Sequence, residues 1–278
     1  MALAPALDLL RLMRPANALV AAAGAYVGAL LARAAWEPTI PVGAAMLAAF
    51  AFAAAGNVRN DLGDVPVDRV AHPDRPLARG AVSPASAGVL AMGLYMLALA
   101  AGALVSWGGF LLVLAAVPVM EGYERWAKAR GLPGNLLVAL LTAAPFVLGA
   151  LAAGGVNAAV ASVAALAALA TAGREVLKDV EDVEADRAHR RTLPMRVGAR
   201  RASLVAAAFL VAAVLLSPLP WMLESVLGAA YLPAVGAADL CFLVAAATGP
   251  RAPGRGQRLA KLGMVAALIA LVLGRALG

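Results

Sequence analysis

Strongly apolar stretches recur along the chain of 278 residues, and each is close to the length of a membrane-spanning helix. Such a helix needs about 20 predominantly apolar residues. Hydrophobic residues make up 63% of the sequence and charged residues only 14%, whereas soluble domains average about 45–50% and about 25%. The sequence therefore predicts an all-α, multi-pass integral membrane protein.

Nine spanning helices can be placed on these stretches. They are expected at about residues 17–35, 40–56, 83–106, 107–120, 135–151, 156–173, 202–217, 221–248 and 262–273. The fourth is expected to continue as a polar helix through Lys128, and Pro233 predicts a kink in the eighth. No linker or low-complexity segment divides the chain, so we expect a single membrane domain over residues 1–278.

An acidic motif follows the second apolar stretch. Asp61, Asp64 and Asp68 are spaced i, i+3, i+7, which places three carboxylates on one face of a helix, and Asn60 falls on the same stripe. Carboxylates at the end of an apolar helix are costly unless a cation meets them. Oxygen ligands favour a hard cation such as Mg²⁺, which often binds carboxylates and substrate phosphates together.

The motif occurs a second time, after the sixth apolar stretch. Asp179, Asp182 and Asp186 repeat the spacing at a constant offset of 118 residues, and a basic loop containing Pro and Gly follows each motif. A single triad could be the solvated end of a helix. Two triads in the same register favour one shared site and predict two related helix groups, with the second and sixth helices at equivalent positions.

Basic residues accompany both motifs. They are Arg69, Arg75, Arg79, Arg174, Lys178, Arg187, Arg190 and Arg191. Acidic groups with Mg²⁺ and basic side chains form the set that binds a diphosphate and stabilises charge on a departing phosphate oxygen. Because the site opens onto an apolar bundle, we expect a substrate with a long hydrocarbon chain that ends in a diphosphate.

The distribution of Lys and Arg predicts the orientation. With the N-terminus inside, nearly all of these residues lie in the inside connections, as the positive-inside rule requires. Both acidic motifs are then expected on the cytoplasmic side of the cell membrane. Membrane lipids are expected partners of the apolar helices. No basic stripe with interleaved aromatic residues is present, so nucleic acid is not an expected partner.

Four segments of the sequence resemble those of a known family. NDLGDVPVD at 60–68 resembles the first aspartate motif of the UbiA-type intramembrane prenyltransferases, and DVEDVEAD at 179–186 resembles the second. LMRPAN at 12–17 and HPDRPLARG at 72–80 are similar to other family signatures. The resemblance covers the whole chain. It implies a helical bundle around a central cavity, dependence on Mg²⁺, and transfer of a prenyl group from its diphosphate to an acceptor.

The predicted roles follow from the motifs and the resemblance together. The six aspartates, Asp61, Asp64, Asp68, Asp179, Asp182 and Asp186, are expected to bind Mg²⁺ and to act in catalysis with Lys178. The expected substrate contacts are Asn17, Asn60, Arg69, Arg75, Arg174 and Lys178. For Lys178 the alternative is an ion pair with Asp182, four residues along the helix.

The acceptor is predicted from the segment REVLK at 174–178. Family members that prenylate aromatic acceptors resemble Tyr-x-x-x-Lys here, whereas Arg174 stands at the Tyr position. REVLKDVED is similar to the archaeal branch that makes digeranylgeranylglyceryl phosphate. This favours geranylgeranyl transfer to the hydroxyl of a glyceryl phosphate ether, with 4-hydroxybenzoate or a related quinone precursor as the alternative. Arg174 is expected to bind the acceptor phosphate, and its alternative is an ion pair with Asp179 or Glu175.

A transporter or cation channel is the competing class of protein, and Asp239 is an acidic residue outside both motifs. Transporters and cation channels also carry acidic residues, but usually near the bilayer midplane between broken helices. Both motifs here follow apolar helices and precede basic loops, which favours an enzyme. Asp239 is an isolated acid inside the eighth apolar stretch, where acids usually face a cavity or a partner, and the sequence assigns it no role.

Overall fold

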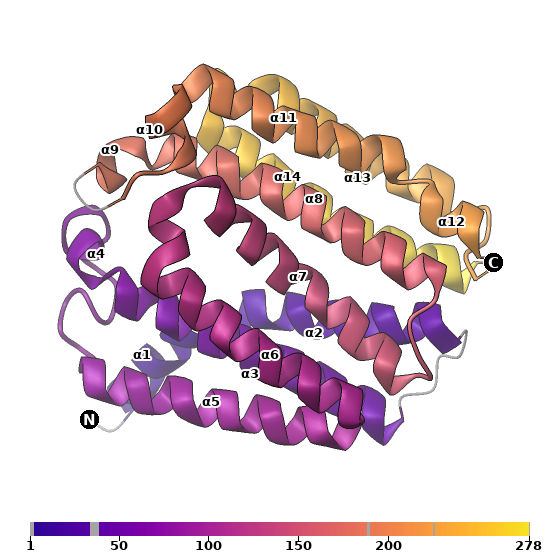
Figure 1. Ribbon diagram of the computed structural model, residues 1–278, viewed down its shortest axis with the longest axis horizontal. Coiled ribbons are helices and arrows are strands. Elements are labelled where there is room, and N and C mark those ends of the chain that lie inside the picture. Colours follow the sequence, from indigo (N-terminus) through magenta and orange to yellow (C-terminus); the bar gives the residue numbers. More distant parts are fainter. Residues whose placement is uncertain (1–2, 34–38, 188–189, 225, 278) are drawn as a thin grey trace.

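The computed structural model describes residues 3–33, 39–187, 190–224 and 226–277, and these residues form helices and connecting segments without strands. The long helices run in roughly the same direction, and the two termini lie at opposite ends of the bundle (Figure 1). The helices are α1 (Leu3–Met13), α2 (Pro15–Arg33), α3 (Ile40–Gly63), α4 (Val65–Ala71), α5 (Pro84–Val105), α6 (Trp107–Gly122), α7 (Leu132–Ala152), α8 (Ala158–Glu181), α9 (Val183–Asp186), α10 (Leu193–Val197), α11 (Ala199–Leu216), α12 (Leu219–Leu223), α13 (Tyr231–Thr248) and α14 (Pro253–Ala276).

The prediction of an all-α, multi-pass membrane fold is confirmed. Within the described ranges, eight segments are long and apolar enough to cross a membrane. The predicted count of nine is approximate, because α6 has only 16 residues and continues as a π-helix over Tyr123–Ala127 and a 3₁₀ turn over Lys128–Arg130. The predicted end of the first helix at Ala35 lies outside the described residues.

The eighth predicted helix is wrong in its first part. The chain forms the short helix α12, leaves helical structure, and begins α13 at Tyr231. Pro233 therefore lies in the first turn of α13 and produces no kink, since the N–H that proline lacks has no partner in a first turn. In the connecting segment, Gly228 N–H donates to the Gly274 carbonyl over 2.8 Å, which ties the segment to the end of α14.

The repeat in the sequence is also a repeat in structure. Helices α3 and α8 each have 24 residues, and α8 begins and ends 118 residues after α3. The side chains of Thr39 and Asn157 cap the two helices in the same way, each accepting a hydrogen bond from the backbone N–H three residues later. The backbone of Asp64 (φ −94°, ψ 1°) matches that of Asp182 (φ −89°, ψ 5°). The two helices thus occupy equivalent places in the two halves of the chain.

Helices α2 and α7 contact each other through glycine. A Cβ atom on Gly149 would overlap the carbonyl oxygen of Ala25, and one on Gly28 would overlap that of Phe146. Any side chain at either glycine would force the two helices apart. Figure 1 shows α2 and α7 between two groups of helices, one made of α3, α5 and α6 and the other of α8, α11, α13 and α14.

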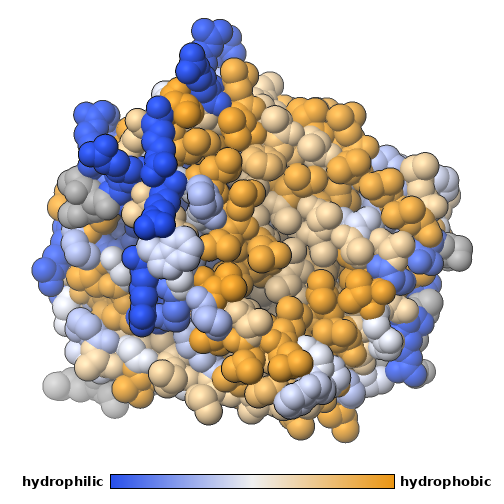
Figure 2. Space-filling model, in the orientation of Figure 1, coloured by the Kyte–Doolittle hydropathy of each residue, from blue (hydrophilic) through white to orange (hydrophobic). Residues whose placement is uncertain are grey.

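The surface matches a membrane environment. In the orientation of Figure 1, apolar side chains cover the middle of the molecule, and hydrophilic side chains gather towards its two ends (Figure 2). The same face is hollowed near its centre among apolar atoms. We call the end that carries α4, α9 and α10 the motif end, because both acidic motifs lie there.

Candidate active site

Each acidic motif is divided between two helices, whereas the sequence predicts one continuous face. Asp61 lies in α3, Asp64 lies at the break after it, and Asp68 lies in α4. Pro66 suits the first turn of α4, where its missing N–H needs no partner, but the second motif breaks without a proline, so proline alone does not cause the break. The second motif has the same arrangement, with Asp182 between α8 and α9.

Arginines neutralise the first motif. Asp61 and Asp68 are buried, at 3% and 4% exposed. Arg75 Nη1 lies 2.7 Å from an oxygen of Asp68 and 3.7 Å from one of Asp61, and Arg14 forms a second ion pair with Asp61. A buried carboxylate without such partners would be costly, so these arginines are part of the site.

Arg14 is placed by an unusual backbone turn between α1 and α2. Its φ of 47° is the only positive φ of a non-glycine residue in the described ranges, and such a conformation is uncommon away from functional sites. The Asn57 amide donates to the carbonyl of Met13 over 2.9 Å and holds this turn against α3. The turn directs the Arg14 side chain to Asp61.

Arg190 connects the two motifs. Its guanidinium forms an ion pair with Asp64 and another with Asp186, the latter at 3.3 Å. Lys128 lies 2.9 Å from Asp64 and 3.0 Å from Glu124. Burial by itself raises the pKa of Asp64, but the charges of Lys128 and Arg190 lower it below its ordinary value. Carboxylates 122 residues apart in sequence thus share one guanidinium.

Apart from the Asp186 pair with Arg190, the second motif has fewer cationic partners than the first. The Asn135 amide donates to Asp179 over 3.0 Å, and Asp182 has no ion pair with any residue in the described ranges. Burial raises the pKa of Asp182 and of Asp186. This half of the site therefore has unbalanced carboxylate oxygen, which favours an additional cation.

The predicted basic contacts differ in their placement. Arg174 pairs with Glu175, as its alternative foresaw, and Lys178 Nζ lies 3.9 Å from Glu175 rather than beside Asp182. Arg75 lies within the first motif. Arg69 is exposed on α4 and has no ion pair with a described residue, so the structure does not bring it to the acidic groups.

The two predicted asparagines also lie at the motif end. Asn60 donates to Glu124 over 3.1 Å. Asn17 is exposed and accepts a hydrogen bond of 3.1 Å from Lys261, which links α2 to α14. Both side chains line the cavity described next.

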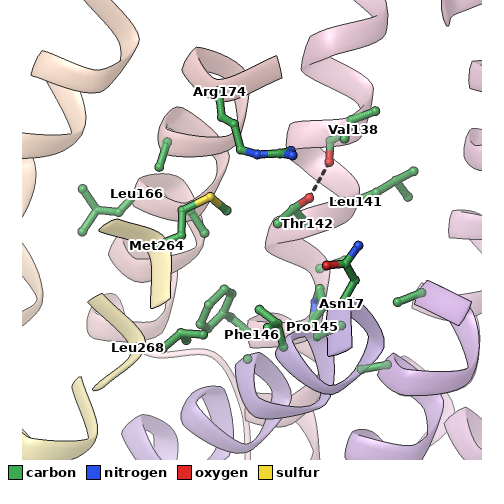
Figure 3. A pocket seen from close by; sticks show the side chains of 18 of the residues that line it. Asn17, Val138, Leu141, Thr142, Pro145, Phe146, Leu166, Arg174, Met264 and Leu268 are labelled. Carbon is green, nitrogen blue, oxygen red and sulfur yellow. Dashed lines mark hydrogen bonds between the residues drawn. The ribbon is translucent and has the colours of Figure 1, made fainter. Parts of the chain in front are cut away.

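A cavity of about 400 Å³ opens beside the motifs, within the range of about 300–1,000 Å³ usual for ligand sites. Polar residues line its motif end, and the wall beyond is mostly apolar. Figure 3 shows Arg174 extending from α8 towards α7, where Leu141 and Thr142 contribute to the same wall. The buried Nε of Arg174 has no hydrogen-bond partner among the described residues.

A second, hydrophilic hollow of about 440 Å³ adjoins Asp61. Arg11, Arg14 and Arg75 all contribute to its wall, and Arg14 lines the first cavity as well. Three guanidinium groups around one hollow suit an anionic group.

The donor chemistry fits a hard divalent cation. Among the described residues, no three His, Cys, Asp or Glu side chains are gathered closely enough to form a ready metal site. The arginines and Lys128 lie between the carboxylates instead. All six motif ligands would be carboxylate oxygens, which suit Mg²⁺, and Asp182, which has no ion pair with a described residue, points the same way.

Sequence reasoning did not single out four residues of this site. Arg14, Lys128 and Asn135 are absent from the predicted set, and Arg190 was placed there only as a neighbouring basic residue. One signal was available, because Asn135 lies 118 residues after Asn17 and so repeats a signature asparagine. Arg14 lies within the signature LMRPAN at 12–17, which was a second signal, whereas no comparable pattern marks Lys128.

The model of the UbiA prenyltransferase family matches residues 21–273. The chain belongs to this family. It is therefore a prenyltransferase, and the predicted resemblance is confirmed. The digeranylgeranylglyceryl phosphate synthase of Natronomonas pharaonis is 41% identical over 271 residues, which cover 96% of each chain.

Solved structures agree with this family fold. A structure reported for digeranylgeranylglyceryl phosphate synthase in membranes is 27% identical, covers 98% of each chain and has a TM-score of 0.79. A UbiA homolog from Archaeoglobus fulgidus bound to GPP and Mg²⁺ is 18% identical, covers 95% of this chain and 99% of its own, and has a TM-score of 0.69. Homologs of this fold thus bind a prenyl diphosphate together with Mg²⁺.

Proposed function

We propose that this prenyltransferase transfers a geranylgeranyl group from geranylgeranyl diphosphate to the hydroxyl of a glyceryl phosphate ether, in archaeal-type membrane lipid synthesis. The observation that carries the proposal is the pair of acidic motifs bridged by Arg190 at the mouth of a mostly apolar cavity. The names of relatives that are 41% identical over nearly their whole length support the same acceptor.

The aspartates Asp61, Asp64, Asp68, Asp179, Asp182 and Asp186 would hold Mg²⁺, which supplies positive charge that stabilises the departing diphosphate. Arg75 and Lys178 add cationic contacts to the same anion. The acceptor oxygen forms a bond to the allylic carbon as the bond from that carbon to the diphosphate breaks, and the hydroxyl proton is released. The apolar wall keeps water away from the positive charge on the allylic carbon.

Arg174 is proposed to bind the acceptor phosphate. Arg174 lines the cavity. Its Nη1 pairs with Glu175, whereas its buried Nε has no partner among the described residues. A guanidinium binds phosphate through two parallel hydrogen bonds, which a tyrosine hydroxyl cannot do. The Lys and Arg distribution further supports a cytoplasmic position for the motif end.

The first test offers purified protein geranylgeranyl diphosphate with either a glyceryl phosphate ether or 4-hydroxybenzoate, and identifies the product. Asp64→Ala and Asp182→Ala should each lower turnover at least about a hundredfold at limiting Mg²⁺. Glu184→Ala is the matched control, since Glu184 lies inside the second motif but its side chain is 80% exposed. Product from 4-hydroxybenzoate alone would refute the proposed acceptor.

The second test measures KM for each substrate in Arg174→Tyr. A rise confined to the glyceryl phosphate is expected if Arg174 binds the acceptor. A rise confined to the prenyl diphosphate would assign Arg174 to the donor instead.

For the aspartate variants of the first test, near-normal activity of both Asp64→Ala and Asp182→Ala at limiting Mg²⁺ would contradict the proposed metal site.

A further inference from the structure

A second polar group lines the same cavity, away from the acidic motifs. Ser217, Tyr231 and Asp239 all belong to its wall, and we call them the Asp239 group. The Ser217 hydroxyl donates to Asp239 Oδ2 over 2.8 Å, and the Tyr231 hydroxyl donates to the Ser217 carbonyl over 2.7 Å. An ionisable residue inside a membrane-spanning helix is costly and usually has a function, and the proposed chemistry at the motifs does not use this one.

The Asp239 group lies deep in the bundle. Gly249, at the motif end of α13, packs against Leu177 of α8, so these two positions lie at the same depth. Asp239 is ten residues before Gly249, which places it about 15 Å further into the bundle at 1.5 Å per residue. Along α8, the lining residues run from Lys178 to Val163, a distance of about 22 Å.

The diphosphate is held at the motifs, beyond the level of Leu177. Asp182 is five residues after Leu177, about 8 Å nearer the motif end, so Asp239 lies roughly 22 Å from the level of Asp182. This distance matches a chain of four isoprene units. Carbon–carbon bonds of about 1.5 Å give such a chain a fully extended length of roughly 19 Å, and a fifth unit adds roughly 5 Å. Between the two polar ends, the wall is apolar and includes Leu166, Ala170, Met264 and Leu268. A four-unit chain with its head at the motifs therefore ends close to the Asp239 group.

A hydrocarbon chain cannot replace the polar contacts of this group. Among the described residues, the carboxyl of Asp239 has a single hydrogen bond, from Ser217, so its other acceptor positions need water. A polar cavity end can hold such water. A longer chain would displace it and leave the carboxyl without partners, which is unfavourable.

We infer that the Asp239 group forms a polar end wall that limits the donor's prenyl chain to about four isoprene units. The inference rests on the proposed function, because it requires a prenyl diphosphate held at the acidic motifs. It makes Asp239 a specificity-determining residue that contacts neither the diphosphate nor the reacting carbon.

The other role open to the group is to join α11 to α13. Hydrogen bonds between helices stabilise membrane proteins, and Ser217 lies at the end of α11 while Asp239 lies within α13. That role requires only the hydrogen bond and has no effect on chain length. The two roles therefore differ in selectivity and can be separated by binding.

The test measures binding of uncleavable thiolodiphosphate analogues with three, four and five isoprene units to the purified full chain in the presence of Mg²⁺. The wild type should bind the five-unit analogue at least about tenfold more weakly than the four-unit analogue, as expected when a buried polar group loses its partner. Asp239→Leu should reduce that difference to about twofold or less. Asp239→Asn should keep it, because an amide also needs polar partners.

Leu240→Ala is the matched control, since Leu240 is the next residue of α13 and is 62% exposed. Thermal unfolding of each variant identifies those that are folded, and Asp239→Ala replaces Asp239→Leu if the larger side chain prevents folding. Ser217→Ala should lower the unfolding temperature but should not reduce the difference in binding between the four-unit and five-unit analogues.

The outcomes separate the two proposals. If folded Asp239→Leu or Asp239→Ala showed the same ratio of four-unit to five-unit binding as the wild type, the end wall would be overturned and the proposed function would stand. Failure of the wild type to bind any prenyl diphosphate would overturn the proposed function, and the end wall with it.

Discussion

Removal of the Arg190 charge should destabilise the protein measurably. The side chains of Arg190, Asp64 and Asp186 are 18%, 13% and 5% exposed, so the charges are poorly solvated. Removing one partner from a buried pair costs about 3–5 kcal/mol. Lys128 lies 2.9 Å from Asp64 and should still balance its charge in Arg190→Gln, so we expect the lower figure, about 3 kcal/mol. At about 2–4 °C per kcal/mol, the unfolding temperature should fall by roughly 6–12 °C.

The assay is thermal unfolding of the purified protein, first with a chelator and then with added Mg²⁺. Because a divalent cation can take the place of the lost guanidinium between the carboxylates, Mg²⁺ should raise the unfolding temperature of Arg190→Gln more than that of the wild type. This expectation follows from the shared contact of Arg190 with both motifs.

Arg187→Gln is the matched control. Arg187 is 69% exposed, and its partner Glu184 is 80% exposed, and such surface pairs contribute at most about 1 kcal/mol. If Arg190→Gln were no less stable than Arg187→Gln in chelator, the two motifs would not depend on this bridge. An equal gain from Mg²⁺ in wild type and Arg190→Gln would show that Arg190 and the metal do not share ligands.

Three further predictions concern other parts of the molecule. Asn135→Ala removes the 3.0 Å hydrogen bond to Asp179 and should raise the Mg²⁺ concentration for half-maximal activity at least about tenfold; an unchanged Mg²⁺ titration would contradict this. Gly149→Leu should abolish folded protein on size-exclusion chromatography, because its side chain would overlap α2, whereas Gly88→Leu should be tolerated since nothing lies near that position. Asp74→Cys in a Cys241→Ser background should react with an impermeant thiol reagent only from the cytoplasmic side, and labelling from outside would reverse the orientation.

Much of the fold could be predicted from the sequence, because apolar length determines where helices cross a membrane. The break between α12 and α13 could not, since residues on both sides of it are apolar. A contact distant in sequence, the hydrogen bond from Gly228 to Gly274, holds this segment in place. The single-domain organisation of the chain stays a prediction.

The acidic half of the site could be predicted, because aspartates in a repeated spacing stand out in an apolar chain. Of their cationic partners, Arg75 was among the predicted contacts, but the other pairs could not be predicted. Arg14 is 47 residues from Asp61, and Arg190 is 126 residues from Asp64. Any of the many arginines at the motif end could satisfy those charges equally well by composition, so only the folded chain selects the pairs. The roles of the six aspartates and of Lys178 stay predictions.

The glycine contact between α2 and α7 restricts how a lipid substrate can enter. Gly28 and Gly149 bring the two backbones together with no side chain between them. A side chain can rotate aside to let a hydrocarbon pass, but a backbone cannot. The contact between α2 and α7 therefore leaves no gap through which a lipid substrate could pass between these two helices.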